Sequence, residues 1–337
     1  MASIKTIAKL AQTSVASVSR VLNNSGYVSA ALRAKIESAI AQTSYQPSSD
    51  ARVLWGGSSN LVGILLPSID VQFFGILAHS MEQALFDLGY QSFICSTAES
   101  AAHEARYVAM FLSRRVGGVI AASAEAGAAH FAPLRAHGIP IVAVDRDLHG
   151  YASDSIVIDH DLGGRMMAQH LIDLGHRHIA VIGAPLHSQS IQRRLAGVRA
   201  ALAQSGLQPV SQQLGTTHDF NQTYDLARRA LASQPTGLIG LTDIAAIGAI
   251  HAAHDLGLRI PHDLSIIGFD DIPSAAFVLP RLTTIAQPIR HLGRGAVDRL
   301  HRLIINDPQT PTESLPALTL IQRDTTAAPK TEACLLL

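Results

Sequence analysis

The stretch AKLAQTSVASVSRVLNNSGYVS, residues 8–29, decides how the N-terminal part of the chain folds. Its apolar residues recur at helical spacing on both sides of a short break at Gln12 and Thr13. Ser14 stands at the N-cap position of the second helix, and residues 23–26, Asn-Asn-Ser-Gly, tolerate the turn geometry that ends it. Two helices joined by so short a turn predict a helix-turn-helix unit.

The flanking residues complete this unit. Ser3 stands where an N-cap is expected for the first helix, whose apolar face begins with Ile4 and Ile7. A third helix is predicted to begin at Ser29 and to end near Tyr45. Residues 1–46 are therefore expected to form a three-helix head.

The charge of the chain is distributed unevenly. The 337 residues carry 26 Lys+Arg and 26 Asp+Glu, and this zero net charge argues at first against a nucleic-acid partner. Residues 1–55, however, carry six basic and two acidic side chains, a net charge of +4, which leaves −4 on the rest. A basic head on an acidic body is compatible with DNA binding by the head.

Residues 46–60, QPSSDARVLWGGSSN, have the composition of a linker, with several Pro, Gly and Ser and few apolar residues. The part from Ser48 to Trp55 is long enough for about two helical turns, which are marginal in water unless a partner holds them. We therefore predict a hinge over residues 47–60.

From Leu61 onward, strand-like and helix-like segments alternate. Continuous apolar runs separated by amphipathic stretches imply parallel sheets that helices cover on both faces. There are too many units for one compact sheet, so we predict an α/β core of two doubly wound lobes. The predicted strands are 61–67, 92–96, 117–122, 140–145, 155–160, 179–184, 237–243, 265–271 and 282–287.

Several functional classes find no support in the sequence. No apolar stretch reaches the roughly 18 residues of a membrane-spanning helix, and the N-terminus lacks the apolar core of a signal peptide. Cys95 and Cys334 are too few for a disulfide framework and too far apart for a metal pair. No GxxxxGKS loop, HExxH zinc pattern or GxSxG nucleophile elbow is present. We expect a cytoplasmic protein that is not an enzyme and uses no cofactor or metal.

The order and spacing of further segments carry a resemblance. Besides residues 8–29, they are LSRRVGGVI (112–120), GIPIVAVDRD (138–147), HLIDLGHRHIAVIG (170–183), RRLAGVRAAL (193–202), GLRIPHDLSIIGFDDI (257–272) and LTTIAQP (282–288). In this order the chain resembles the lactose-repressor (LacI/GalR) family of bacterial transcription regulators over about residues 3–323. The resemblance implies a helix-turn-helix head, a hinge and a two-lobed core like that of periplasmic binding proteins.

The second helix is the expected reader of the DNA major groove. Val15 and Ala16 can contact thymine methyls or base edges, and Arg20 can pair with guanine through two hydrogen bonds. By resemblance, Leu54 wedges into the minor groove at the operator centre. The full expected DNA-facing set is Thr6, Ser14, Val15, Ala16, Ser17, Ser19, Arg20, Asn23, Tyr27, Ala51 and Leu54. The alternatives are a protein-binding helical bundle and a plain flexible tether.

Polar side chains follow several predicted strands, where open α/β sheets bind ligands. Carboxylates paired with arginine and accompanied by an aromatic ring suit a polyhydroxylated ligand. By resemblance, the expected effector-binding residues are Phe73, Asp145, Arg146, Arg194, Phe220, Asp243 and Asp270.

Three places depart from the family pattern. The family usually has glycine where Gln12 stands, and glutamine suits that place only if the turn does not need left-handed backbone. Trp55, Gly56 and Gly57 stand after Leu54, where the family commonly has basic or polar residues. Thr242 replaces an asparagine that often contacts ligand.

The predicted core covers residues 61–337, with an N-lobe of about 61–160 plus 289–320 and a C-lobe of about 161–288 plus 321–330. We expect a homodimer on a palindromic operator, because one helix-turn-helix reads only a half-site. The predicted function is a repressor of a carbohydrate-utilisation operon that responds to a sugar. The alternatives are a purine- or nucleoside-responsive regulator of the same family and a sugar-binding protein without a DNA role.

Overall fold

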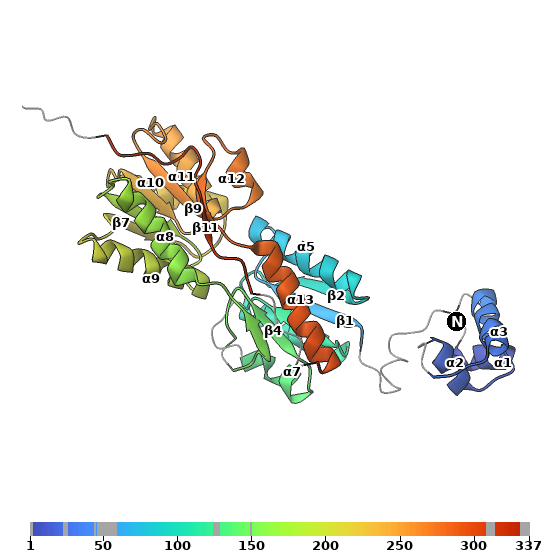
Figure 1. The fold of residues 1–337 in the computed structure, drawn as a ribbon. Coiled ribbons are helices and arrows are strands. Elements are labelled where there is room, and N and C mark those ends of the chain that lie inside the picture. The colour runs from blue at the N-terminus through green and yellow to red at the C-terminus, as the bar shows by residue number, and fades with distance from the viewer. Residues whose placement is uncertain are drawn as a thin grey trace, which may run out of the picture. The chain divides into compact units, whose positions relative to one another are not determined.

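The structure is a computed structural model that describes residues 3–22, 26–43, 45, 59–123, 129–148, 150–307 and 314–330. The chain divides into two compact units, Met1–Asn60 and Leu61–Leu337. We refer to them as the head and the core, and each is described by itself (Figure 1). Residues 47–58 of the expected hinge, with Ala51 and Leu54, and the expected DNA contact Asn23 lie outside the described residues.

The head consists of three helices, α1 (Ile4–Leu10), α2 (Val15–Leu22) and α3 (Ala30–Thr43). Ser3 caps α1 as expected, since Ser3 Oγ accepts a hydrogen bond from Thr6 N–H at 3.2 Å. Ser14 Oγ likewise accepts from Ser17 N–H at 3.1 Å at the start of α2. One apolar cluster holds the three helices together, and its fully buried members are Ile7, Val18 and Ile36. The predicted helix-turn-helix unit is therefore present.

The turn between α1 and α2 corrects the expectation for Gln12. Gln12 has φ 53°, so the turn does need left-handed backbone, and glutamine adopts it. The hydrogen bonds explain why: Thr13 N–H donates to Ala8 O at 2.9 Å and Gln12 N–H donates to Lys9 O at 3.3 Å. This pair of bonds is a Schellman motif, which places the residue after the C-cap in the left-handed region.

We expect Gln12→Gly to stabilise the head by about 0.5–1 kcal/mol. Glycine adopts left-handed backbone without the strain of about 1–2 kcal/mol that another residue bears there. Part of this gain is lost because glycine also raises the conformational entropy of the unfolded chain. Slower amide hydrogen exchange in α1 and α2 is the measurement. The matched control is Gln42→Gly within α3, which should lower stability by about 1 kcal/mol. Faster exchange in both variants would contradict the assignment of strain to Gln12.

The N-lobe of the core contains a parallel sheet in the order β2-β1-β3-β4-β5. Its strands are β1 (Leu61–Leu66), β2 (Gln91–Ser96), β3 (Gly118–Ala121), β4 (Ile141–Val144) and β5 (Asp154–Ile156). Ile64 and Leu65 of β1 join different apolar clusters, because helices cover both faces of the sheet. The covering helices are α5 (Gln72–Asp87), α6 (Ala101–Ser113), the short α7 (Ala132–Ala136) and α13 (Ile289–Ile305).

The C-lobe contains a second sheet in the order β11-β10-β9-β8-β6-β7, parallel except for the antiparallel pair β10–β11. Its strands are β6 (Ile179–Gly183), β7 (Ser211–Leu214), β8 (Gly237–Gly240), β9 (Ser265–Asp270), β10 (Thr283–Ala286) and β11 (Thr319–Ile321). Its helices are α8 (His160–Asp173), α9 (Gln189–Gln204), α10 (Phe220–Leu231), α11 (Asp243–Asp255) and α12 (Pro273–Phe277). All nine predicted strands are present, and β7 and β11 are additional.

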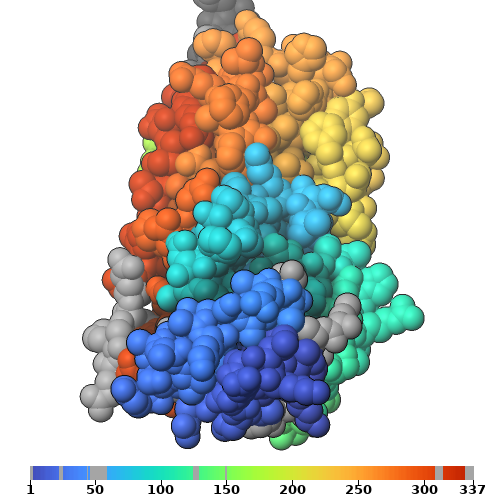
Figure 2. All heavy atoms as spheres, turned by 90° about the vertical axis from the view of Figure 1, so that its right-hand side faces the viewer, coloured from blue at the N-terminus to red at the C-terminus, as the bar shows by residue number. Residues whose placement is uncertain are grey.

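The chain crosses between the lobes three times: between β5 and α8, between β10 and α13, and between α13 and β11. Figure 1 shows α13 beside α5 and β4 although it comes late in the sequence. The last crossing is complete by Thr319, which pairs with Ala286, so residues 319–320 lie in the C-lobe and not in the N-lobe as expected. The lobes also meet where Ser274 Oγ donates to Gln72 Oε1 at 2.8 Å. Figure 2 shows light-blue atoms of the N-lobe against orange atoms of the C-lobe.

Candidate functional site

A cavity lies between the two lobes of the core. Its polar walls come from the carboxyl ends of strands, since Asp145 follows β4, Thr242 follows β8 and Asp270 ends β9. Helices α5 and α9 supply most of the remaining wall. The lining residues are Val71, Phe73, Phe74, Asp145, Arg146, Ser188, Ser190, Ile191, Arg194, His218, Thr242, Ile244, Asp270 and Ile272.

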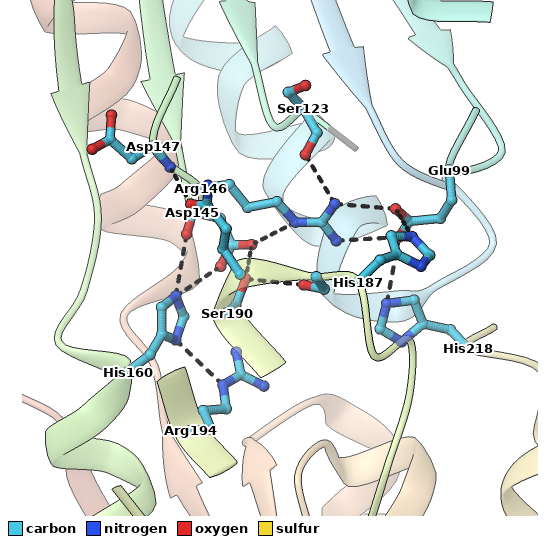
Figure 3. A network of polar contacts seen from close by, with 12 residues as sticks. Glu99, Ser123, Asp145, Arg146, Asp147, His160, His187, Ser190, Arg194 and His218 are labelled. Carbon is cyan, nitrogen blue, oxygen red and sulfur yellow. Dashed lines mark hydrogen bonds and ion pairs between the residues drawn. The ribbon is translucent and has the colours of Figure 1, made fainter. Parts of the chain in front are cut away.

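Asp145 lies at the centre of the polar network in Figure 3. Its Oδ2 accepts a hydrogen bond from Ser190 Oγ at 3.0 Å and lies 3.8 Å from Arg146 Nε. Its Oδ1 lies 3.4 Å from His160 Nε2. Burial alone would raise the pKa of Asp145, but His160 and the nearby guanidinium groups hold it well below its usual range. Asp145 is therefore ionised and available to accept hydrogen bonds from hydroxyl groups.

Arg194 on α9 is buried and held on several sides. Its Nη1 donates to Leu241 O at 2.8 Å and lies 3.4 Å from Asp270 Oδ1. Its guanidinium carbon lies 3.8 Å from the centre of the Phe269 ring, a cation–π contact. This packing fixes the charged group against the cavity wall.

The imidazole of His160 links Asp145 to Arg194. Arg194 Nε donates to His160 Nδ1 at 3.3 Å, and His160 Nε2 lies 3.2 Å from Asp145 O. Because Arg194 has only N–H groups to offer, Nδ1 must be unprotonated and the ring proton lies on Nε2. Burial lowers the pKa of His160, in agreement with a neutral ring.

Asp270 completes the polar wall. Gln287 Nε2 donates to Asp270 Oδ1, and the carboxyl group is buried. Burial raises its pKa to about 8 despite the opposing charge of Arg194. A protonated Asp270 can donate a hydrogen bond to a ligand, whereas Asp145 only accepts.

Two of the expected effector residues lie elsewhere. Phe220 is the first residue of α10, is 40% exposed, and contacts His251 edge-on with ring centres 5.4 Å apart. Asp243 is fully buried, and its carboxylate accepts hydrogen bonds from Ile272 N–H at 2.9 Å and Thr284 Oγ1 at 2.6 Å. Asp243 thus ties α11 to β10 and to the loop after β9. Burial raises its pKa to about 7.

Several lining residues were not expected from the sequence. His218, in the loop before α10, lines the cavity where Phe220 was expected to stack, and it packs edge-on against Phe74 with ring centres 6.3 Å apart. Ser188 and Ser190 open α9 and face Asp145. Thr242 lines the cavity while its Oγ1 accepts from Ala245 N–H at 3.2 Å as the N-cap of α11.

In the head, the expected DNA-facing residues differ in their surroundings. Val18 and Val21 of α2 are buried in the head, whereas Ala16 and Arg20 are exposed and Val15, Ser17 and Ser19 are half-buried. Tyr27 is 90% exposed. Ser14 and Thr6 are exposed but already bonded as helix caps, Thr6 Oγ1 accepting from Ser3 N–H at 3.3 Å. An exposed face of α2 with Ala16 and Arg20 is the geometry that groove reading needs.

Comparison with known proteins decides the family. Residues 3–48 match the model "Bacterial regulatory proteins, lacI family", and residues 168–326 match "Periplasmic binding protein-like domain". The chain is 34% identical over 316 residues to a ribose operon repressor of Halalkalibacterium halodurans, covering 91% of this chain and 92% of that protein. The chain belongs to the LacI family. It is therefore a transcriptional regulator and not an enzyme.

Other LacI-family proteins agree with this assignment. A PurR transcriptional repressor of Glaesserella parasuis is 32% identical over 318 residues, with 93% of each chain covered. The structure of the lac repressor dimer bound to operator and an anti-inducer has a TM-score of 0.85 and 29% identity, covering 97% of this chain and 99% of that one. Among the residues that the structure describes, no helix is long and apolar enough to cross a membrane.

Proposed function

We propose that this LacI-family regulator represses transcription by binding a palindromic operator as a homodimer, and that a sugar in the cavity between the lobes changes its affinity for the operator. The observation that carries the proposal is the wall of the cavity. Asp145 and Arg146 come from one lobe and Arg194 and Asp270 from the other, so one bound ligand contacts both lobes. As a regulator of transcription the protein acts in the cytoplasm.

The chemistry of the wall favours a sugar. Carboxylates and guanidinium groups at fixed positions match the donors and acceptors of adjacent hydroxyl groups. Phe73 and Phe74, with ring centres 4.9 Å apart, add an apolar surface for the carbon-bound face of a sugar ring. A purine or nucleoside is the second candidate, since the PurR relative is nearly as similar as the ribose operon repressor.

Exposed apolar side chains support the homodimer. Helix α5 packs against β2, an edge strand. Phe86 and Leu88 at the end of α5, and Phe93 and Ile94 on β2, are all at least 38% exposed. Such surface is typical of an interface between subunits. In a twofold dimer, each subunit presents the same surface to its partner.

The regulatory step follows from linkage. A ligand that contacts both lobes binds one lobe arrangement more tightly than the other, and it shifts their populations by that difference in affinity. Release of the operator makes the ligand an inducer, and tighter binding makes it a corepressor. A gel shift of the full-length protein on a palindrome selected from random duplexes, with and without sugars, is the test. The proposal fails if the palindrome is not preferred over random DNA or if no sugar or purine changes the binding.

We expect Arg20→Ala to weaken operator binding by about ten- to a hundredfold, because a bidentate contact to guanine contributes about 1–3 kcal/mol of discrimination. Binding to random duplexes should fall much less, since Arg20 contributes only one charge to it. Fluorescence anisotropy on both duplexes is the measurement. The matched control is Arg33→Ala on α3, which removes the same charge. Equal losses on operator and random DNA would contradict the base-reading role of Arg20.

A further inference from the structure

The side chain of Glu99 reaches Arg146 from the loop between β2 and α6. Arg146 Nη1 and Nη2 donate to its two carboxylate oxygens at 3.1 Å each, and Nη1 also donates to Ser123 O at 2.9 Å. Among the three guanidinium nitrogens of Arg146, Nε alone makes no hydrogen bond to the residues that the structure describes, and it lies 3.8 Å from Asp145 Oδ2. The guanidinium group in the cavity wall is thus neutralised from within the protein.

Two histidines of the C-lobe surround the same carboxylate (Figure 3). His187 Nε2 lies 3.3 Å and His218 Nε2 lies 3.7 Å from the oxygens of Glu99. The Glu99 side chain is only 14% exposed. Burial alone would raise its pKa, but Arg146 holds the pKa below its usual range, so Glu99 is charged. Without Glu99, this corner would present Arg146 and the imidazole of His218 to the cavity.

The other charges of the wall leave no spare cation. Arg194 lies between Asp270 and Asp145, and burial lowers the pKa of His218 to about 4, so this histidine is neutral. No lysine lines the cavity in the described part of the chain. Two guanidinium groups therefore face the carboxyl groups of Glu99, Asp145 and Asp270. A phosphate or carboxylate on a ligand would add a buried negative charge, and no cation of the wall is free to pair with it. Burying an unpaired charge in this way is strongly unfavourable.

We infer that the effector is an uncharged polyhydroxylated molecule and that Glu99 is the specificity-determining residue that excludes anionic ones. The inference rests on the proposed function, because it specifies the ligand of that same cavity. It separates neutral sugars from sugar phosphates and sugar acids. The carboxylate of Glu99 already occupies the place beside Arg146 where the anionic group of a ligand would otherwise bind.

The test uses inorganic phosphate as a probe that does not depend on the identity of the sugar. Thermal unfolding of the full-length protein is followed in phosphate and in chloride at equal ionic strength. Phosphate stabilises folded proteins in general because it is excluded from their surface, so we expect the wild type to show only this general gain, which is the reference for the variants. Glu99→Ala, which opens the position, and Glu99→Gln, which removes only the charge, should both be stabilised by phosphate beyond this gain, because a ligand of the native state raises its stability. D-Ribose 5-phosphate should bind Glu99→Ala at least about tenfold more tightly than it binds the wild type.

Two controls separate charge from general damage. Glu99→Asp keeps the carboxylate, so its unfolding temperature should respond to phosphate only as that of the wild type does. Asp87→Asn removes an exposed carboxylate at the end of α5 and should leave the response to phosphate unchanged. The inference is overturned if the wild type gains as much from phosphate as Glu99→Ala, or if neither Glu99→Ala nor Glu99→Gln responds beyond the general gain. The proposed function fails on a different observation, the absence of a preference for a palindrome in the gel shift.

Discussion

Replacing Gly197 with alanine is expected to destabilise the core by about 3 kcal/mol or more. A Cβ at Gly197 on α9 would lie 2.0 Å from Asp161 O, and a Cβ at Gly164 on α8 would lie 2.0 Å from Arg194 O. Both obstacles are backbone atoms, so no side chain can rotate away, and overpacking of this kind costs about 1–3 kcal/mol or more. The two helices must separate, and α9 would carry Arg194 away from the cavity.

Urea denaturation of the full-length protein measures this effect as a lower midpoint. The matched control is Gly75→Ala in α5, where the new Cβ would lie 3.5 Å from Ile69 O, an ordinary contact. This control should be neutral or more stable by about 0.5–1 kcal/mol, because alanine favours a helix interior over glycine. If Gly197→Ala and Gly75→Ala change the midpoint equally, α8 and α9 do not touch through their backbones.

Replacing Arg194 with alanine is expected to cost about 3–5 kcal/mol at neutral pH and to abolish the effector response. Removing one member of a buried ion pair leaves the other charge uncompensated. Here the uncompensated charge is that of Asp145, because Asp270 is already protonated at neutral pH, and the ring of Phe269 loses its cation. The matched control is Arg193→Ala, which removes an exposed arginine from the same helix turn.

The loss in Arg194→Ala should depend on pH. In the wild type, burial already raises the pKa of Asp270 to about 8, and removing Arg194 takes away the charge that opposes this rise. The native-state pKa then lies above the unfolded value of about 3.9. Such a group contributes stability that is fully present below the unfolded pKa and is lost as the pH rises through the native pKa. Asp270 is protonated in the native state of both proteins up to about pH 8, so both lose stability alike between about pH 4 and pH 8. The denaturation midpoints of variant and wild type should therefore diverge only above about pH 8, where Asp270 ionises beside Arg194 in the wild type but stays protonated in the variant. A deficit that does not grow above about pH 8 would contradict the role of Asp270.

The elements of the core were predictable because their signals are local. Continuous apolar runs identified nine strands, and positions after strands identified Asp145, Arg146 and Asp270. Strand β7, Ser-Gln-Gln-Leu, was not predicted from the sequence because three of its four residues are polar. Strand β11 has only three residues. Both lie at edges of the C-lobe sheet, where pairing and not composition makes the strand.

The rest of the site depends on loop geometry that composition does not report. Glu99 reaches Arg146 because Ala98 and Glu99 both have left-handed backbone, at φ 52° and 57°, in a loop without glycine. His218 replaces Phe220 at the cavity because Asp219 caps α10, so Phe220 already belongs to the first helical turn. For Phe73 and Arg194, the resemblance to the family supplied what the local pattern lacked.

Helix α13 determines when the core can finish folding during synthesis. Its buried residues Leu292 and Leu300 cover a face of the N-lobe sheet, and Leu300 fills the space that Gly118 leaves open. A ribosome makes all of β1 to β10 before this helix emerges. Until then, the N-lobe sheet has apolar surface exposed to solvent. Strand β11 emerges after α13 and pairs with β10 at the edge of the other sheet. Both lobes are thus completed at nearly the same moment, late in translation, and until then the nascent chain exposes apolar surface that favours aggregation.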